Sequence, residues 1–132
     1  MAKINYHGRK FRGISNTPNG QVSGNTIFCY AQIGDKLEAT YSGGSILEGH
    51  MIGHVHEDNS LEFVYHHIDD EGVLKSGHCK STSEILNDGR IRLHETWVWT
   101  FGGEGKGWAE GQDSHLHFPP GRRQSYLLDD PR

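Results

Sequence analysis

Apolar and polar positions alternate along most of this chain. From residue 26 to residue 100 the alternation has a period of two, whereas no window of 11 residues before the C-terminal tail places apolar positions at the helical spacing of 3.6. Turn-forming pairs interrupt the alternation at Gly34-Asp35, Gly43-Gly44, Asp58-Asn59, Asp70-Glu71 before Gly72, and Asp88-Gly89. The pattern predicts a succession of antiparallel strands joined by tight turns.

Five hairpins in succession predict six strands, over residues 26–33, 36–42, 45–56, 61–69, 73–86 and 90–101. Residues 3–14 and 107–118 each predict one further strand, which makes about eight. An open sheet of this size would expose two long edges, and closure into a barrel removes them. We therefore expect an all-β fold with a single up-and-down antiparallel barrel. A β-sandwich is the alternative, because local alternation says nothing about closure.

The strands fall within one domain, residues 1–118. Residues 119–132, which begin with Pro-Pro-Gly and end with Asp-Asp-Pro-Arg, predict a flexible or docking C-terminal tail. Tyr126, Leu127 and Leu128 would anchor it.

The composition supports a turn-rich domain and excludes several classes of protein. The 132 residues include 18 glycines and only 4 prolines, and the net charge is −4. Basic residues form only short clusters, so a nucleic-acid partner is not expected. A run of about 18 apolar residues is missing, so no membrane span is expected. Without a secretory signal at the N-terminus, we expect a cytoplasmic protein with Cys29 and Cys79 as thiols.

Two-residue turns would determine which residues lie opposite one another across the sheet. They predict Tyr30 opposite Ala39, His50 opposite His67, and His78 opposite Trp99. One face then collects Phe28, Tyr30, Tyr41, Ile46, His50, Ile52, His54, Phe63, Tyr65, His67, His78, Glu95, Trp97 and Trp99. A three-residue loop at 70–72 with a bulge would instead flip the last two strands and bring Cys79 to this face.

An aromatic wall with a few histidines and one acid is typical of a small-molecule pocket, although a solidly packed core has the same pattern. We expect a small hydrophobic or aromatic molecule to contact Tyr41, His50, Phe63, His78, Trp97 and Trp99. Glu95, His67 and Tyr65 are the candidate catalytic residues, since a buried carboxyl beside a histidine can act as a general acid or base.

The histidines also suggest a metal site, since imidazole is a common metal ligand. His54-x-His56 followed by Glu62 partly matches the first metal-binding motif of cupins, but its glycine spacing differs and the later histidine is not in place. We therefore expect neither a metal nor another cofactor.

Three segments carry a resemblance to a known family: YSGG at 41–44 with Gly49 and Gly53 after it, GHCKST at 77–82, and DGRIRLHETWVW at 88–99. They resemble a family of small bacterial proteins often labelled N-acetylglutamate synthase, from about residue 4 to residue 100. That family is similar to calycin-type barrels, whose relatives include lipocalin-like binding proteins and cofactor-free lyases and cyclases. The resemblance implies a calycin-like barrel. The chain lacks the Q/R-x-x-G-x-G/A loop and helix of acetyl-CoA-dependent enzymes, so acetyl transfer is not expected.

Three hypotheses about function follow. The first is a binding module that holds a small molecule in an aromatic and histidine-lined cavity. The second is a cofactor-independent lyase, isomerase or cyclase that uses Glu95 and His67 as an acid–base pair. The third is an interaction protein with a filled barrel, which forms a homodimer through a sheet face or the tail.

Overall fold

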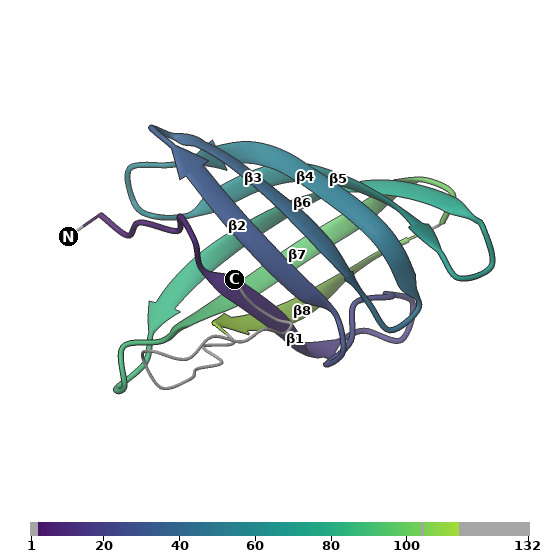
Figure 1. Ribbon diagram of the computed structural model, residues 1–132, viewed down its shortest axis with the longest axis horizontal. Helices are drawn as coiled ribbons and strands as arrows, with labels where there is room; N and C mark the ends of the chain where they lie inside the picture. The colour runs from purple at the N-terminus through teal and green to yellow at the C-terminus, as the bar shows by residue number, and fades with distance from the viewer. Residues whose placement is uncertain (1–2, 104, 114–132) are drawn as a thin grey trace.

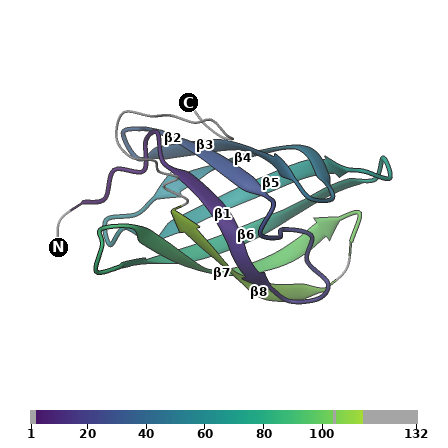
Figure 2. The same ribbon diagram turned by 60° about the horizontal axis from the view of Figure 1, so that its bottom comes forward.

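The computed structural model describes residues 3–103 and 105–113, and it confirms the all-β barrel. Eight antiparallel strands follow one another around a closed barrel (Figure 1): β1 (Lys10–Asn16), β2 (Ile27–Ile33), β3 (Lys36–Gly43), β4 (Ile46–Val55), β5 (Leu61–Asp69), β6 (Leu74–Ile85), β7 (Ile91–Phe101) and β8 (Lys106–Asp113). Figure 2 shows β1 beside β8, where Arg12 pairs with Gln112 and closes the sheet. The alternative of an open sandwich is therefore wrong.

The first strand begins later than its alternation predicts. Residues 3–9 form no strand, and β1 starts at Lys10 because this segment crosses the end of the barrel instead of extending along its wall. The last strand, predicted over 107–118, is described as far as Asp113. The rest of it and the predicted tail at 119–132 lie outside the described residues.

Three of the hairpin loops contain three residues. Backbone hydrogen bonds from His56, Asp69 and Leu86 to the carbonyl oxygens of Ser60, Val73 and Arg90 enclose residues 57–59, 70–72 and 87–89. The third loop residue has a left-handed backbone in each case, with φ of 71° at Asn59, 80° at Gly72 and 87° at Gly89. The two-residue turn at Gly34-Asp35 is as predicted, and it places Tyr30 opposite Ala39.

Each added loop residue moves the next strand by one position, which reverses the faces of its side chains. The 57–59 loop places His50 opposite His66, not opposite His67. A register shift near the start of β4, between Ile46 and Glu48, separately turns His50, Ile52 and His54 to the outer surface. The 70–72 loop turns Cys79 inward and His78 outward, the alternative that we considered. The 87–89 loop shifts the register once more, so Trp97 lies opposite Cys79 inside the barrel.

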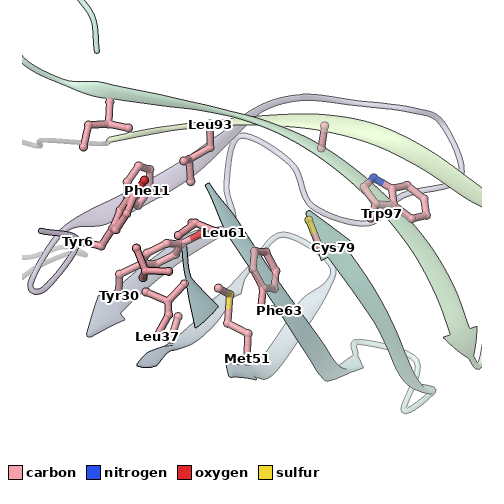
Figure 3. Close-up of a cluster of buried hydrophobic side chains, with 14 of the residues drawn as sticks. Tyr6, Phe11, Tyr30, Leu37, Met51, Leu61, Phe63, Cys79, Leu93 and Trp97 are labelled. Atoms are coloured by element: carbon pink, nitrogen blue, oxygen red, sulfur yellow. The ribbon is translucent and has the colours of Figure 1, made fainter. Parts of the chain in front are cut away.

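The two ends of the barrel differ. The end with the β2–β3, β4–β5 and β6–β7 turns is called the plugged end, and the end with the other four connections is called the mouth. At the plugged end the buried side chains form a continuous core with Tyr6, Phe11, Tyr30, Leu37, Leu61 and Leu93 (Figure 3). The rings of Phe11 and Tyr30 lie 4.6 Å apart between centroids.

The N-terminal segment is the plug. Tyr6 is fully buried, and its hydroxyl donates to the carbonyl oxygen of Asn59 at 2.7 Å and contacts Ser83 Oγ. The amide of Ile4 donates to Asn59 Oδ1 at 2.8 Å. These bonds join the segment to the β4–β5 loop, so residues 3–9 seal an opening that the strands leave.

Truncation of the plug should destabilise the whole barrel. We expect Tyr6→Ala to lower the free energy of unfolding by about 3–5 kcal/mol through loss of a buried ring, and Tyr6→Phe by about 1–2 kcal/mol through loss of its hydrogen bonds. Urea denaturation followed by tryptophan fluorescence measures both changes. The matched control is Phe101→Ala, an exposed ring on β7 that should alter stability by less than about 0.5 kcal/mol. A loss below about 1 kcal/mol for Tyr6→Ala would show that the segment is no plug.

Candidate functional site

The mouth half of the barrel contains a cavity. Six aromatic residues line it: Phe28, Tyr41, Phe63, Tyr65, Trp97 and Trp99. Polar side chains complete the wall, among them Asn16, Gln21, His67 and Glu95. The free space is about 460 Å³ when it is counted out to the mouth, but the centre of a water molecule can move through only about 40 Å³ of it. The cavity is therefore narrow, with room for a thin molecule or a few waters.

The cavity remains open because its aromatic rings lie against glycines of the wall. Four aromatic residues have a glycine as their cross-strand partner: Tyr41 with Gly49, Phe63 with Gly53, Tyr65 with Gly77, and Trp97 with Gly107. A Cβ added to Gly49 would lie 2.5 Å from Tyr41 Cε2, and one added to Gly107 would lie 2.7 Å from Trp97 Cζ2. The rings thus occupy the space of the missing side chains and leave the centre free.

The aromatic rings also contact one another around the cavity. Phe28 stacks on Tyr41 with centroids 4.7 Å apart, and Trp97 meets Trp99 at 5.4 Å in an edge arrangement. Tyr65 meets Trp99 at 5.9 Å in the same way. Edge and offset contacts of this kind stabilise ring positions, so the wall is organised without a ligand.

A chain of hydrogen bonds crosses the mouth and determines the state of His67. The Gln21 amide donates to Asp69 Oδ2 at 3.0 Å, which turns Gln21 Oε1 toward His67 Nε2 at 2.7 Å. His67 Nε2 is therefore the protonated nitrogen, and Nδ1 accepts from the Tyr41 hydroxyl at 2.8 Å. Burial lowers the pKa of His67 to about 4 and raises that of Tyr41. His67 and Tyr41 are therefore uncharged at pH 7, and the charge of the network lies on Asp69, whose pKa is lowered by hydrogen bonds from Val73 and Gln21.

The end of β1 and the β1–β2 connection, residues 17–26, lie over this wall and are bonded to the tryptophans. The Trp97 indole donates to Asn16 Oδ1 at 3.1 Å, and the Trp99 indole donates to the carbonyl oxygen of Asn19 at 3.1 Å. Sequence reasoning missed Asn16 and Gln21, because a polar residue in a turn-rich segment carries no periodic signal. The connection covers the cavity, and both indole N–H groups are already used.

Glu95 is the acid of the cavity. It lies on β7 between its register partners Ser81 and Ala109, and its Oε2 accepts from Ser81 Oγ at 2.8 Å. Burial raises the pKa of Glu95 to about 7, and the Ser81 bond opposes this rise. Burial, with the charge of Glu95, also raises the pKa of the neighbouring Cys79 thiol. Glu95 can therefore take up or release a proton near neutral pH.

The structure brings together seven of the predicted site residues and separates two from them. The cavity is lined by Tyr41, Phe63, Tyr65, His67, Glu95, Trp97 and Trp99. His50 and His78 were assigned to the wrong face: a register shift near the start of β4 turns His50 outward, and the three-residue loop at 70–72 turns His78 outward. On the outer surface, His50 Nε2 lies 3.0 Å from Glu48, and His78 Nε2 lies 2.7 Å from Glu62.

Two further features of residues 3–103 and 105–113 bear on function. No three histidine, cysteine, aspartate or glutamate side chains in these ranges are arranged to hold a metal ion. The same ranges contain no helix of the length and apolarity that a membrane-spanning helix needs.

Comparison with known families agrees with this architecture. Residues 4–112 match the family described as avidin-like protein, a range that extends from the plug to β8. The chain belongs to the avidin-like family. Comparisons with curated proteins and with solved structures give no significant match. The cavity of this avidin-like barrel occupies the mouth half, and the plugged half supplies the main core.

Replacement of Gly49 by alanine should push Tyr41 away from the wall. We expect Gly49→Ala to lower the free energy of unfolding by about 2–3 kcal/mol, because the new Cβ overlaps a ring whose hydroxyl bonds to His67. Chemical denaturation of the single and double variants measures this. The loss should fall below about 1 kcal/mol in a Tyr41→Ala background, where no ring remains to be displaced.

The matched control is Gly111→Ala. A Cβ at this β8 glycine would meet only the Arg12 carbonyl oxygen, at an ordinary 3.7 Å. Its stability should change by less than about 0.5 kcal/mol. Equal losses at Gly49 and Gly111, or an undiminished loss in the Tyr41→Ala background, would contradict the ring-on-glycine interpretation.

The raised pKa of Glu95 should appear as a pH dependence of stability. Between the usual value of 4.5 and about 7 the folded protein binds more protons than the unfolded chain, so the contribution of Glu95 to stability falls as pH rises. Relative to the native protein, Glu95→Gln should therefore gain about 2–3 kcal/mol between pH 5 and pH 8. Denaturation curves of both proteins at several pH values measure this difference. The contributions of other titrating groups are the same in both proteins and cancel. The exposed Glu57→Gln variant should show no such gain, and a flat difference for Glu95→Gln would refute the assignment.

Proposed function

We propose that this avidin-like barrel binds a small, flat, apolar or aromatic molecule in its mouth half. The observation that carries the proposal is the unequal filling of the barrel. The plugged half is packed with large side chains, whereas the mouth half presents six aromatic rings to a narrow space. A stable fold does not require this space, so we infer that it serves a ligand.

The composition of the wall supports this proposal. Pockets for small molecules are mostly apolar and contain a few polar groups that orient the ligand. Here Trp97 and Trp99 would supply stacking area, and Glu95 would supply the polar contact. Avidin-like proteins bind small molecules such as biotin and are often oligomeric, which agrees with a small-molecule partner.

The width of the cavity restricts the ligand. Only a thin molecule enters the space as it stands, and a thicker one requires Asn16, at the end of β1, and the β1–β2 connection to move away from Trp97 and Trp99. That movement would break two indole hydrogen bonds, each with a net value of about 1 kcal/mol. A flat ring system is therefore favoured over a bulky one.

We do not extend the proposal to a Glu95–His67 acid–base pair. Both ring nitrogens of His67 are used by Tyr41 and Gln21, and the low pKa keeps the ring neutral. Proton transfer would first have to break this network. Glu95 has a suitable pKa for acid–base chemistry, but it would act without His67.

An oligomer is compatible with ligand binding. Ile52 and Val64 are cross-strand partners on the outer surface and are each about half exposed, which gives a sheet face on which copies of the chain could associate. The predicted homodimer through a sheet face stays a prediction, and native mass spectrometry reports it together with any retained small molecule.

Ligand binding should depend on the inner tryptophans and not on the outer one. A thermal-shift screen of small aromatic and cyclic compounds, with biotin included, should return ligands whose affinity falls by about 10- to 100-fold in Trp97→Ala. Isothermal titration calorimetry measures the affinities. Trp108→Ala is the matched control, because this indole lies on β8 outside the barrel and is half exposed. Ligands that bind Trp97→Ala and Tyr65→Ala as tightly as the native protein would place the site elsewhere.

A further inference from the structure

Glu95 has no positive partner among the described residues. Its one described hydrogen bond comes from Ser81, a neutral group, and burial is the main influence on its ionisation. The ion pairs of the described residues, such as His78 with Glu62, involve other acids. A buried carboxylate without a counter-charge is costly, and proteins usually pair it or neutralise it. The described residues therefore leave the charge of this carboxyl unpaired.

The ionisable groups that face Glu95 are neutral at pH 7. They are the Cys79 thiol on β6, the Tyr65 hydroxyl on β5 and the Tyr30 hydroxyl on β2, and burial raises the pKa of each. On β8 the neighbour is Ala109, which does not titrate. His67, farther along the wall, is neutral because its pKa is about 4. Glu95 is thus the one lining residue of the described cavity that carries charge at neutral pH.

The groups around this carboxyl suit a cation. Glu95 and Trp97 are two positions apart on β7, so their side chains share the inner face of the barrel. Tyr65, Phe63 and Trp99 line the same cavity. The faces of aromatic rings attract a positive charge by about 0.5–2 kcal/mol each when water is excluded, and an anion gains nothing from them.

We infer that the cavity takes an organic cation: a small molecule whose ammonium, amidinium or guanidinium group lies at Glu95 and whose flat body lies against Trp97 and Trp99. This inference rests on the proposed function, because it names the ligand class of the same cavity. The cation would supply the ion pair that Glu95 lacks among the described residues, while the aromatic wall would replace part of its hydration. The chain's net charge of −4 also favours the approach of cations.

The test compares three flat probes of nearly equal shape: benzamidinium, which is positive, benzamide, which is neutral, and benzoate, which is negative. Isothermal titration calorimetry at pH 8 measures their affinities for the native protein. We expect benzamidinium to bind more tightly than benzamide by a factor of about ten or more, and benzoate to bind most weakly.

Glu95→Gln keeps the shape of the side chain and removes its charge. This variant should lose the preference for benzamidinium while it binds benzamide about as well as the native protein does. Glu57→Gln removes the same charge from an exposed loop at the plugged end and should keep the preference. Circular dichroism of both variants checks that the barrel is intact.

The pH dependence supplies an independent readout. In the native protein the affinity for benzamidinium should fall as the pH is lowered below 7, because the Glu95 carboxyl takes up a proton. The decrease should approach about tenfold for each pH unit. The affinity for benzamide should stay nearly constant over the same range. The Glu95→Gln variant should show no fall for either probe.

The outcomes separate this inference from the proposed function. Equal binding of benzamidinium and benzamide, both lost in Trp97→Ala, would overturn the cation preference and leave the cavity as a binding site. A benzamidinium preference that persists in Glu95→Gln would also overturn the inference, because the cation would then lie elsewhere. Absence of binding by all three probes, with no ligand from the wider screen, would overturn both.

Discussion

The hollow half of this barrel depends on aromatic rings that lie over glycines of the neighbouring strand. A ring can lie flat against the wall only where the opposite residue has no Cβ, and Gly49, Gly77 and Gly107 meet this condition for Tyr41, Tyr65 and Trp97. With alanine at these positions the rings would have to swing toward the axis and fill it. Part of the high glycine content is thereby explained by packing inside the barrel and not only by turns.

Turn length decides which side chains reach that interior. The loops at 57–59, 70–72 and 87–89 each add one residue to a two-residue hairpin, and each reverses the faces of the strand that follows. Two of these reversals fall between β5 and β7, so they cancel, and Trp97 and Glu95 share the interior with Tyr65. If the 87–89 loop were shorter by one residue, Trp97 and Glu95 would face the solvent.

Two ionisable groups of the cavity have opposite properties because their surroundings differ. His67 has both nitrogens bonded to neutral groups and is surrounded by rings, so it stays uncharged. Among the described residues Glu95 has a single, neutral donor, so burial leaves its charge uncompensated there. The first residue therefore organises the mouth, and the second is the group that a ligand of opposite charge would satisfy. Asn16 and the β1–β2 connection cover the cavity, and their hydrogen bonds to Trp97 and Trp99 must break before a thick molecule can enter.

The alternation of apolar residues and the turn signals determined the strand number, the antiparallel order and the aromatic character of one face, because these depend on local geometry. Gly72 and Gly89 also carry a local signal for the three-residue loops, because glycine readily adopts the left-handed backbone that the third loop position needs. Only the tertiary structure decided that His50 and His78 face outward, since a register error accumulates across successive strands. It alone placed Tyr6 against Asn59 and Gln21 against His67, contacts that span 53 and 46 positions. Such contacts leave no trace in a periodic pattern, because they form only when the closed sheet brings distant segments together.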